Sequence, residues 1–340
     1  MNVSDKIKYV GVDDLDIDLF ESQYVVPEGM SYNSYVILDE KTAVMDTVDA
    51  RKTDEWINNV KVALGGKNLD YIVCLHMEPD HAGSMMKAME TFPTAKVVGN
   101  AKTFTYMAQF FDVNLEGRKV EVKDGESLSL GEHNLTFVCA PMVHWPEVMV
   151  AYESSEKVLF AADAFGKFGA ISKYDGDWAC EARRYYFNIC GKYGVQVQSL
   201  LKKAAALDIK TIAPLHGPVL KENLGYYLDL YNTWSSYGVE SEGVLVAFAS
   251  IHGNTRKAAE KIASILEKQG AKKVVVSDLS RDDEAEVIED AFRYGRMIIA
   301  APTYDGGLFP PMESFLSHLK SKNYQKRTVG IIENGTWAPM

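Results

Sequence analysis

The stretch that decides the fold is Asp70-Tyr71-Ile72-Val73-Cys74-Leu75-His76-Met77-Glu78-Pro79-Asp80-His81. Its first half has the length and composition of a buried strand. Its second half holds four ligand-capable side chains. Alternate residues of an extended chain share a face, so His76, Glu78 and Asp80 are expected to point together, with His81 reaching around. Burying two imidazoles and two carboxylates without a metal is expensive, so the cluster predicts a metal site.

Three more ligand-type residues lie at the ends of other predicted strands. His144 follows the predicted strand 135–139, while Asp163 and His216 close the apolar runs at 157–162 and 210–215. Taken singly, each is more often a structural hydrogen-bonding residue than a ligand. Together with the first cluster they make seven ligands, enough for two metals with open positions for substrate.

The chain before residue 242 combines hairpins with strands interleaved by helices. Residues 31–48 predict a hairpin, and the apolar spacing of 54–64 predicts a helix that ends at Gly65-Gly66. A long helical region is expected from about Trp178 to Leu207. This mixture predicts mixed sheets in an α+β first domain, residues 1–242.

From about residue 243 the pattern alternates strictly between strand and helix. Strands are expected at 244–249, 273–277, 297–301 and 328–332, with helices at 255–268, 284–294 and 311–319. This is the pattern of an α/β doubly wound parallel sheet, so residues 243–340 form the second domain. The sheet is expected to be incomplete, because its fifth strand is missing, and the chain is therefore expected to be truncated at its C-terminus.

Three loops of the second domain predict a flavin site. The first places hydroxyls, a glycine and free N–H groups at a helix N-terminus, which makes a phosphate cradle without the lysine of an NTPase loop. Loops one, three and four converge at the switch point of the 2-1-3-4-5 strand order, and these are the three loops. The predicted FMN-binding residues are Ser250, Ile251, His252, Gly253, Asn254, Thr255, Pro302, Thr303, Tyr304, Asp305, Gly306, Gly307, Asn334, Gly335, Thr336 and Trp337.

Composition excludes several other classes of function. Lys and Arg number 36 and Asp and Glu 47, which gives a net charge of −11, and no basic tract offers a nucleic-acid footprint. No apolar run is long enough for a transmembrane helix, and the first residues do not read as a signal peptide. The four cysteines, which include no Cys-x-x-Cys pair, predict reduced thiols in a cytoplasmic protein.

The first 240 or so residues resemble a metallo-β-lactamase domain, an αββα sandwich whose pattern is His-x-His-x-Asp-His followed by His, Asp and His. Glu78 replaces the second His of that pattern. Zinc favours nitrogen and sulfur, whereas the added carboxylate gives an oxygen-richer site that suits iron. Ser250 to Thr255 similarly resembles the phosphate loop of flavodoxins.

Both domains in this order, with Glu78, resemble the flavodiiron proteins. Motifs at 29–35, 162–166, 185–189 and 214–218 share the resemblance. It implies a non-haem diiron centre, with His76, Glu78 and His144 on one iron, Asp80, His81 and His216 on the other, and Asp163 bridging. It also implies reduction of O₂ to water, of NO to N₂O, or both, with FMN relaying electrons to the irons.

The resemblance leaves the gas preference and the electron donor open. Without a Cys-x-x-Cys pair or a Gly-x-Gly-x-x-Gly fingerprint, the chain is expected to need rubredoxin or a reduced flavoprotein as donor. A head-to-tail homodimer is expected. Tyr32, Trp145, Tyr174 and Tyr193 are candidates to contact the gas. Two alternatives stay open: a dizinc hydrolase with an accessory flavodoxin-like domain, and an electron carrier fused to an inert domain.

Overall fold

The computed structural model describes residues 2–335, and the chain divides into two compact units. The first unit comprises Met1–Ala182 and Gln196–Leu228, and the second comprises Arg183–Val195 and Asp229–Met340. Each unit has its own sheets and core. These units are defined by packing rather than by chain order, so the domain boundary near residue 242 stays a prediction.

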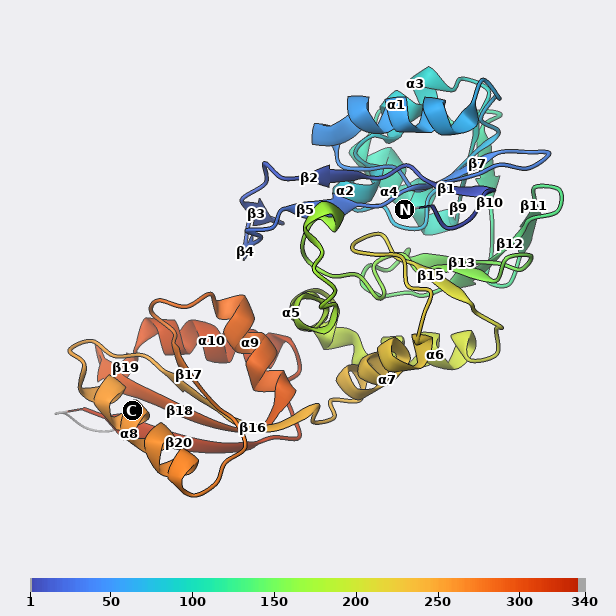
Figure 1. The fold of residues 1–340 in the computed structure, drawn as a ribbon. Helices are drawn as coiled ribbons and strands as arrows, with labels where there is room; N and C mark the ends of the chain where they lie inside the picture. The colour runs from blue at the N-terminus through green and yellow to red at the C-terminus, as the bar shows by residue number, and fades with distance from the viewer. Residues whose placement is uncertain (1, 336–340) are drawn as a thin grey trace. The chain divides into compact units, whose positions relative to one another are not determined.

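The first unit is built on two sheets that carry helices on their outer sides (Figure 1). The six-stranded sheet has the order β1 (Ile7–Tyr9), β6 (Tyr35–Ile37), β7 (Ala43–Met45), β8 (Tyr71–Val73), β9 (Lys96–Gly99) and β10 (Lys119–Glu121). The five-stranded sheet has the order β11 (Ser127–Ser129), β12 (Asn134–Cys139), β13 (Met149–Glu153), β14 (Val158–Phe160) and β15 (Thr211–Ala213). Both sheets mix parallel and antiparallel pairs, so the predicted αββα sandwich of mixed sheets is confirmed.

The remaining elements of this part of the chain are short hairpin strands and helices. Two small pairs are β2 (Val12–Asp14) with β5 (Met30–Tyr32), and β3 (Leu19–Phe20) with β4 (Tyr24–Val25). The helices are α1 (Thr53–Leu64), α2 (Pro79–Ala82), α3 (Met85–Thr91), α4 (Ala101–Phe110), α5 (Ala179–Ile189), α6 (Gly194–Ala204) and α7 (Leu224–Ser235), with 3₁₀ turns at Ala50–Lys52, Ile171–Lys173 and Gly191–Tyr193.

Helix α1 shows why these sequences adopt these elements. It buries Trp56, Ile57, Val60 and Leu64, which recur at helical spacing, and it stops where Gly65 takes the left-handed conformation at φ 57°. The region expected to be helical from about Trp178 to Leu207 is helical but interrupted, because the chain forms α5 and α6 with a 3₁₀ turn between them. Two glycines lie at the break, and a Cβ at Gly194 would approach the carbonyl oxygen of Ser235 to 2.3 Å.

The second unit is a four-stranded parallel sheet in the order β17 (Val274–Asp278), β16 (Ser241–Phe248), β18 (Tyr294–Tyr304) and β20 (Thr328–Asn334). Figure 1 shows α8 (Asn254–Lys268) on one face and α9 (Glu284–Arg293) and α10 (Pro310–Ser321) on the other. The predicted doubly wound order is confirmed. β18 runs past residue 301 and turns back at Asp305-Gly306, both with positive φ, into β19 (Gly307–Leu308).

A buried ion-pair network holds Arg183 in the second unit. Its Nε and Nη2 donate to the carboxylate of Glu240 at 2.6 and 2.7 Å, and Nη1 donates to Glu289. Trp234 Nε1 also donates to Glu240, at 2.6 Å. Burial raises the pKa of Glu289 to about 8, although the charge of Arg183 opposes the shift. The network ties residues near 183 to α9 although about a hundred positions separate them in the chain.

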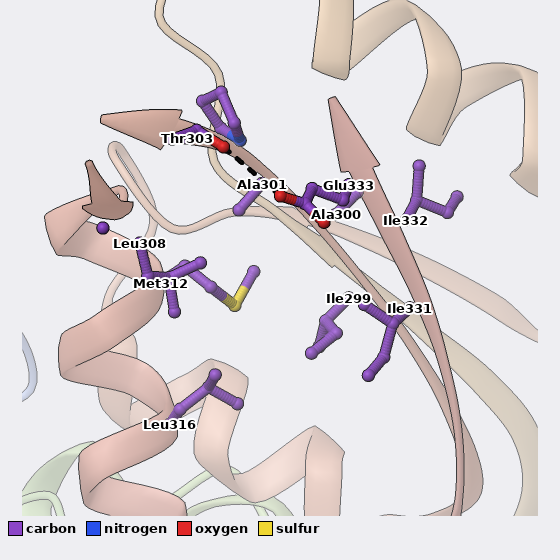
Figure 2. Close-up of a pocket in the computed structure, with 12 residues that line it drawn as sticks. Ile299, Ala300, Ala301, Thr303, Leu308, Met312, Leu316, Ile331, Ile332 and Glu333 are labelled. Carbon is purple, nitrogen blue, oxygen red and sulfur yellow. Dashed lines mark hydrogen bonds between the residues drawn. The ribbon is translucent and has the colours of Figure 1, made fainter. Parts of the chain in front are cut away.

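An apolar cavity of about 280 Å³ lies against β18, β20 and α10 (Figure 2). Ile299, Met312, Leu316, Ile331 and Ile332 are among its lining residues. At one end of the cavity, Thr303 Oγ1 donates a hydrogen bond to Glu333 Oε1 at 3.3 Å (Figure 2). Within residues 2–335, no helix has the length and apolar character needed to cross a membrane.

Gly83 generates a stability prediction, because it ends α2 where the backbone is crowded. An added Cβ would lie 2.5 Å from the Pro79 carbonyl oxygen and 2.8 Å from the Ala50 nitrogen. We expect Gly83→Ala to lower the free energy of unfolding by ~1–3 kcal/mol in urea titrations. Gly225→Ala is the matched control, since its Cβ meets open space within α7 and should be neutral or stabilising by up to ~1 kcal/mol. Equal losses in both variants would contradict the crowding argument.

Candidate metal centre and flavin site

The ligand-rich stretch from His76 to His81, which follows shortly after β8, does not stay extended as expected from the sequence. Pro79 begins the short helix α2, and the N–H groups of His81 and Ala82 donate to the Glu78 carbonyl at 2.9 and 2.8 Å. Proline favours the first helical position because its missing N–H has no partner there anyway. The expectation that His76, Glu78 and Asp80 share one face is therefore wrong. Asp80 turns with the helix and joins a different group of side chains.

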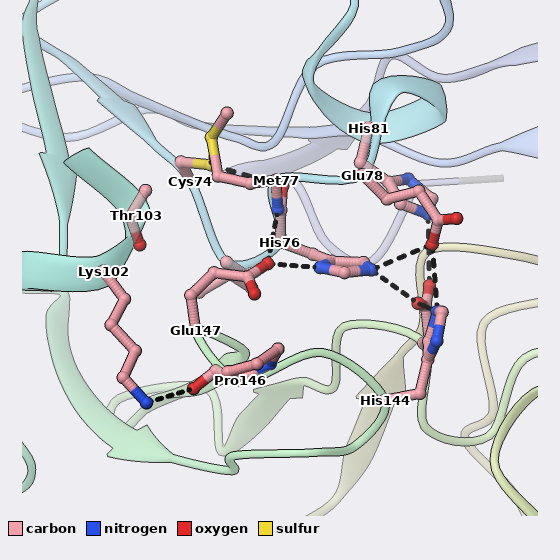
Figure 3. Close-up of polar contacts among 12 residues, drawn as sticks. Cys74, His76, Met77, Glu78, His81, Lys102, Thr103, His144, Pro146 and Glu147 are labelled. Atoms are coloured by element: carbon pink, nitrogen blue, oxygen red, sulfur yellow. Dashed lines mark hydrogen bonds and ion pairs between the residues drawn. The ribbon is translucent and has the colours of Figure 1, made fainter. Parts of the chain in front are cut away.

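The seven predicted ligand residues form two groups. His76, Glu78, His144 and Asp163 make the first, and Asp80, His81 and His216 make the second. Within each group the potential ligand atoms lie within 4.8 Å of one another. His144 comes from the β12–β13 connection, Asp163 follows β14 and His216 follows β15. The ends of strands from both sheets therefore deliver these side chains to the two groups. Figure 3 shows four of them, His76, Glu78, His81 and His144.

Asp163 faces both groups. Its Oδ2 lies 3.2 Å from Nε2 of His76 and 3.2 Å from Nε2 of His144. Its Oδ1 lies 3.1 Å from Nε2 of His81 and 3.7 Å from Nε2 of His216. One carboxylate oxygen is thus directed to each group, which is the arrangement of a carboxylate that could be shared by two cations.

Glu78 and Asp80 complete the two groups. Oε2 of Glu78 lies 2.9 Å from Nε2 of His144 and 3.1 Å from Nε2 of His76. Oδ2 of Asp80 lies 3.2 Å from Nε2 of both His81 and His216. Each group thus offers imidazole nitrogens and carboxylate oxygens whose separations fit donors around one ion.

Unpaired buried atoms test whether the residues fit metals. Among the described residues, both carboxylate oxygens of Asp80 and of Asp163 are buried without a hydrogen-bond partner of suitable geometry, as is Nε2 of His81 and of His144. Leaving so many polar atoms unsatisfied is costly unless a cation binds them. The donor set therefore fits two metal ions.

The pKa values show how strongly these groups need a compensating charge. Burial would lower the pKa of His144, but the close carboxylates of Asp163 and Glu78 outweigh it and raise the pKa to about 9. Burial would raise the pKa of Asp163, but the charges of His76 and His81 hold it well below its usual range. Without metal the carboxylates thus draw protons onto the imidazoles, and a metal would take the place of those protons.

Three contacts around the cluster were missed from the sequence. His76 Nδ1 lies 2.7 Å from Oε1 of Glu147, and His216 Nδ1 lies 2.6 Å from the carbonyl oxygen of Ser31. Asp46 Oδ1 accepts the backbone N–H groups of Leu75, at 2.7 Å, and His76, at 3.2 Å. Glu147 could have been noticed in the sequence as an acidic residue beside an apolar strand. The carbonyl of Ser31 could not, because a backbone acceptor leaves no signal in the sequence.

Aromatic side chains enclose the cluster. Trp145 lies edge-on to His76 at 5.3 Å between ring centroids, while Phe20 and Tyr32 lie 5.5 and 6.1 Å from the ring of His216. Of the residues expected to contact the gas, Tyr32 and Trp145 therefore adjoin the cluster. The other two candidates have different surroundings. The ring centroid of Tyr174 lies 5.2 Å from Nζ of Lys167, and Tyr193 belongs to the second unit.

The three predicted flavin loops surround a cavity of about 380 Å³ in the second unit. Its lining comprises Ser250, Ile251, His252, Asn254, Thr255, Pro302, Thr303, Tyr304, Asp305, Asn334 and Gly335. Gly253 directly precedes α8, with φ 83°, and donates its N–H to Ser250 Oγ at 3.1 Å. No side chain of the described residues caps this helix, so its first N–H groups suit a phosphate.

The remaining predicted flavin residues lie elsewhere or beyond the described part. Gly306 forms the turn between β18 and β19, and Gly307 lines the apolar cavity of Figure 2 instead. Thr336 and Trp337 lie outside the described residues. Asn334 Nδ2 donates to Thr255 Oγ1 at 3.2 Å, which joins the first and last loops across the cavity.

Two family profiles match the chain. The ODP family beta lactamase matches residues 30–217, which hold all seven residues of the cluster. A flavodoxin domain matches residues 245–338, which hold the three loops. The order of the two matches agrees with the order of the two predicted domains.

Similar proteins cover nearly the whole chain. A nitric oxide reductase of Moorella thermoacetica is 31% identical over 326 residues, which is 93% of this chain and 81% of that protein. An uncharacterised protein of Methanocaldococcus jannaschii is 30% identical over 94% of this chain and 81% of its own length. The solved rubredoxin oxygen:oxidoreductase of Desulfovibrio gigas has 26% identity and a TM-score of 0.91, with 99% and 86% coverage.

Solved structures of lower identity share the fold. The flavodiiron protein of Giardia intestinalis has a TM-score of 0.93 with 24% identity, over 99% of this chain and 84% of that one. Sequence profiles, relatives and fold thus agree on a beta-lactamase-like domain followed by a flavodoxin domain. The chain therefore belongs to the flavodiiron protein family.

Proposed function

We propose that this protein reduces O₂ to water, NO to N₂O, or both, with electrons passing from an external donor through FMN to a diiron centre. The observation that carries the proposal is the pair of ligand groups with Asp163 facing both. Support comes from relatives named nitric oxide reductase and rubredoxin oxygen:oxidoreductase. The loops around the cavity of the second unit support FMN as the second cofactor.

Iron is the metal that this donor set favours. Glu78, Asp80 and Asp163 add three carboxylates to the four histidines, and a site rich in oxygen donors suits iron better than zinc. His76, Glu78 and His144 would hold one iron, Asp80, His81 and His216 the other, and Asp163 would bridge them. When bound, the irons would polarise the diatomic substrate and, together with FMN, exchange the electrons that the reduction needs.

Neighbouring residues of the chain hold the ligand side chains in place. Glu147 and the Ser31 carbonyl each bind Nδ1 of one histidine, which leaves Nε2 of His76 and of His216 directed at the metals. Trp145, Phe20 and Tyr32 lie edge-on to these histidine rings and fix their orientation. In the second unit, the N-terminus of α8 would hold the FMN phosphate.

A dizinc hydrolase is the alternative that the donor set and the second unit disfavour. Glu78 replaces a nitrogen donor, and the loops at the switch point of the flavodoxin domain have no role in hydrolysis. An electron carrier fused to an inert domain is disfavoured too, since unpaired buried ligand atoms would serve no purpose there.

We also propose the partners that the resemblance implies. Rubredoxin or a reduced flavoprotein would donate the electrons, and a head-to-tail homodimer would place the FMN of one chain near the irons of the other. The reducing cytoplasm would be its compartment, in keeping with the free thiols of Cys74 and Cys139.

Metal analysis tests the iron assignment. Protein produced with ample iron should contain about two irons per chain, at the spacing of ~3.5–4 Å that two-metal sites show. Elemental analysis gives the content, and magnetic coupling between the irons reports a shared ligand. Comparing O₂ and NO turnover on one preparation gives the gas preference. Zinc at both positions, in protein without either reductase activity, would instead favour the hydrolase.

Glu78→His tests whether that carboxylate selects the metal. We expect reductase turnover to fall at least ~10-fold and bound metal to shift towards zinc, because a nitrogen donor replaces an oxygen donor. Glu90→His makes the same change at an exposed position on α3 and should alter neither quantity. Unchanged iron content and turnover in Glu78→His would show that Glu78 does not discriminate between the metals.

A third experiment tests the need for an external donor. The purified chain with FMN should oxidise NADH slowly, and adding rubredoxin with its NADH-dependent reductase should restore rapid O₂ or NO consumption. The reason lies in the given sequence, which contains no Gly-x-Gly-x-x-Gly fingerprint for NADH and no Cys-x-x-Cys pair for a rubredoxin-type iron. Rapid NADH oxidation by the chain alone would refute the requirement.

A further inference from the structure

A cavity of about 500 Å³ lies in the first unit, and none of its lining residues is one of the seven ligand residues. Segments 26–29, 167–170 and 173–181 supply the lining. The backbone joins the first two segments, because the N–H of Ala170 donates to the carbonyl oxygen of Glu28 at 3.0 Å. A cavity of this volume can hold a small organic molecule.

Lys167 brings a buried ammonium group to this cavity. The residue is only 6% exposed, and its Nζ lies 5.2 Å from the centroid of the Tyr174 ring. A Cβ at Gly169 would lie 3.4 Å from the same Nζ, and all three residues line the cavity. Among residues 2–335, no hydrogen bond or ion pair reaches this ammonium, and its close partner is the aromatic ring. A buried cation without an oxygen acceptor is costly, and a bound oxygen would remove that cost.

Packing holds the lysine in this position. A Cβ at Gly217 would lie 2.6 Å from Cγ of Lys167, so the glycine leaves the space that the stem of the lysine fills. The fold therefore directs the ammonium to the cavity, whereas the ends of most lysines extend into solvent. An ammonium held at a cavity wall in this way is suited to bind an anionic oxygen.

Acidic side chains lie around the cavity at longer range. Burial lowers the pKa of Lys167, while the charges of Glu181, Asp175 and Asp177 oppose that shift. These three residues line the cavity too, yet none of them forms an ion pair with Lys167. Space for a ligand therefore remains between the ammonium and the carboxylates.

This combination of charges disfavours two simpler ligands. A metal ion would need several ligand atoms at one point, and within the described part of the chain the carboxylates of this cavity form no such group. An anion without a positive charge would bind the ammonium but would be repelled by the surrounding carboxylates. A ligand with both an anionic oxygen and a cationic group satisfies the two sides together, and an α-amino acid carries both groups on one carbon.

We propose that this cavity is a binding site for a free α-amino acid with an apolar side chain. The carboxylate of the amino acid would accept a hydrogen bond from Nζ of Lys167, and its ammonium would face Asp175 and Glu181. Its side chain would contact Val26 and Phe168, which are buried apolar residues of the same lining. All the lining residues belong to the first unit, so the site stands independently of the proposed diiron function.

Isothermal titration calorimetry on the full chain tests the site with three matched probes. L-valine carries both charges, isovalerate is the same molecule without the amine, and isobutylamine is the same molecule without the carboxylate. L-valine should bind at a single site per chain, at least ~10-fold more tightly than either of the other probes. The reason is that only L-valine satisfies Lys167 and the acidic residues together.

Lys167→Met removes the ammonium and keeps a long side chain at the buried position. We expect it to weaken L-valine binding at least ~10-fold and to preserve the fold, because an apolar side chain suits a buried position. Lys202→Met is the matched control, since Lys202 is exposed on α6 and does not line the cavity. It should leave the affinity for L-valine unchanged. Glu181→Gln tests the acidic side and should weaken binding ~3-fold, because Glu181 is only partly buried.

Each outcome decides for or against the proposal. It is overturned if L-valine does not bind the unchanged protein, or if isovalerate or isobutylamine binds as tightly as L-valine. It is also overturned if Lys167→Met binds L-valine as tightly as the unchanged protein does. Thermal unfolding followed by circular dichroism checks that the variants fold. If Lys167→Met does not fold, the three probes and Glu181→Gln decide the question without it.

Discussion

The position of one buried carboxylate, Asp163, constrains the whole first unit. Its two oxygens must reach two groups of histidines whose nitrogens lie 3.1 to 3.7 Å away. A buried carboxylate is stable only when hydrogen-bond donors or positive charges satisfy its oxygens. The strands that bring histidines to both of its oxygens must therefore end at the same place, and they come from both sheets. The sandwich provides that convergence, because β8 lies in one sheet while β14 and β15 lie in the other.

Much of this arrangement could be predicted from the sequence, because the six residues from His76 to His81 concentrate four ligands just after an apolar strand. The strict alternation after residue 243 predicted the parallel sheet equally well. The orientation of Asp80 could not be predicted from strand periodicity, since Pro79 starts a helix at that point. The preference of proline for the first position of a helix outweighed the alternation expected of an extended chain, although Pro79 was visible in the sequence.

Other features depended on contacts between distant residues. Glu147 binds His76 across 71 positions of the chain, and the Ser31 carbonyl binds His216 across 185. Backbone acceptors carry no side-chain signature, so no reading of a single sequence finds them. Helix α4 was missed for a different reason. Its signals were local and were passed over: Asn100 and Thr103, which bond each other's backbone in a capping box, and Phe104 and Met107, which are buried at helical spacing.

The ion pairs of Arg183 affect how this protein can be dissected. Arg183 precedes the flavodoxin match by some sixty positions, yet it neutralises Glu240 and the buried Glu289. A fragment beginning at residue 243 would lose Arg183, Trp234 and Glu240 and leave Glu289 buried without its cation. Removing one partner of such a pair costs about 3–5 kcal/mol. A recombinant flavodoxin domain cut at the family boundary would therefore be a poor reference for the flavin chemistry of the intact chain.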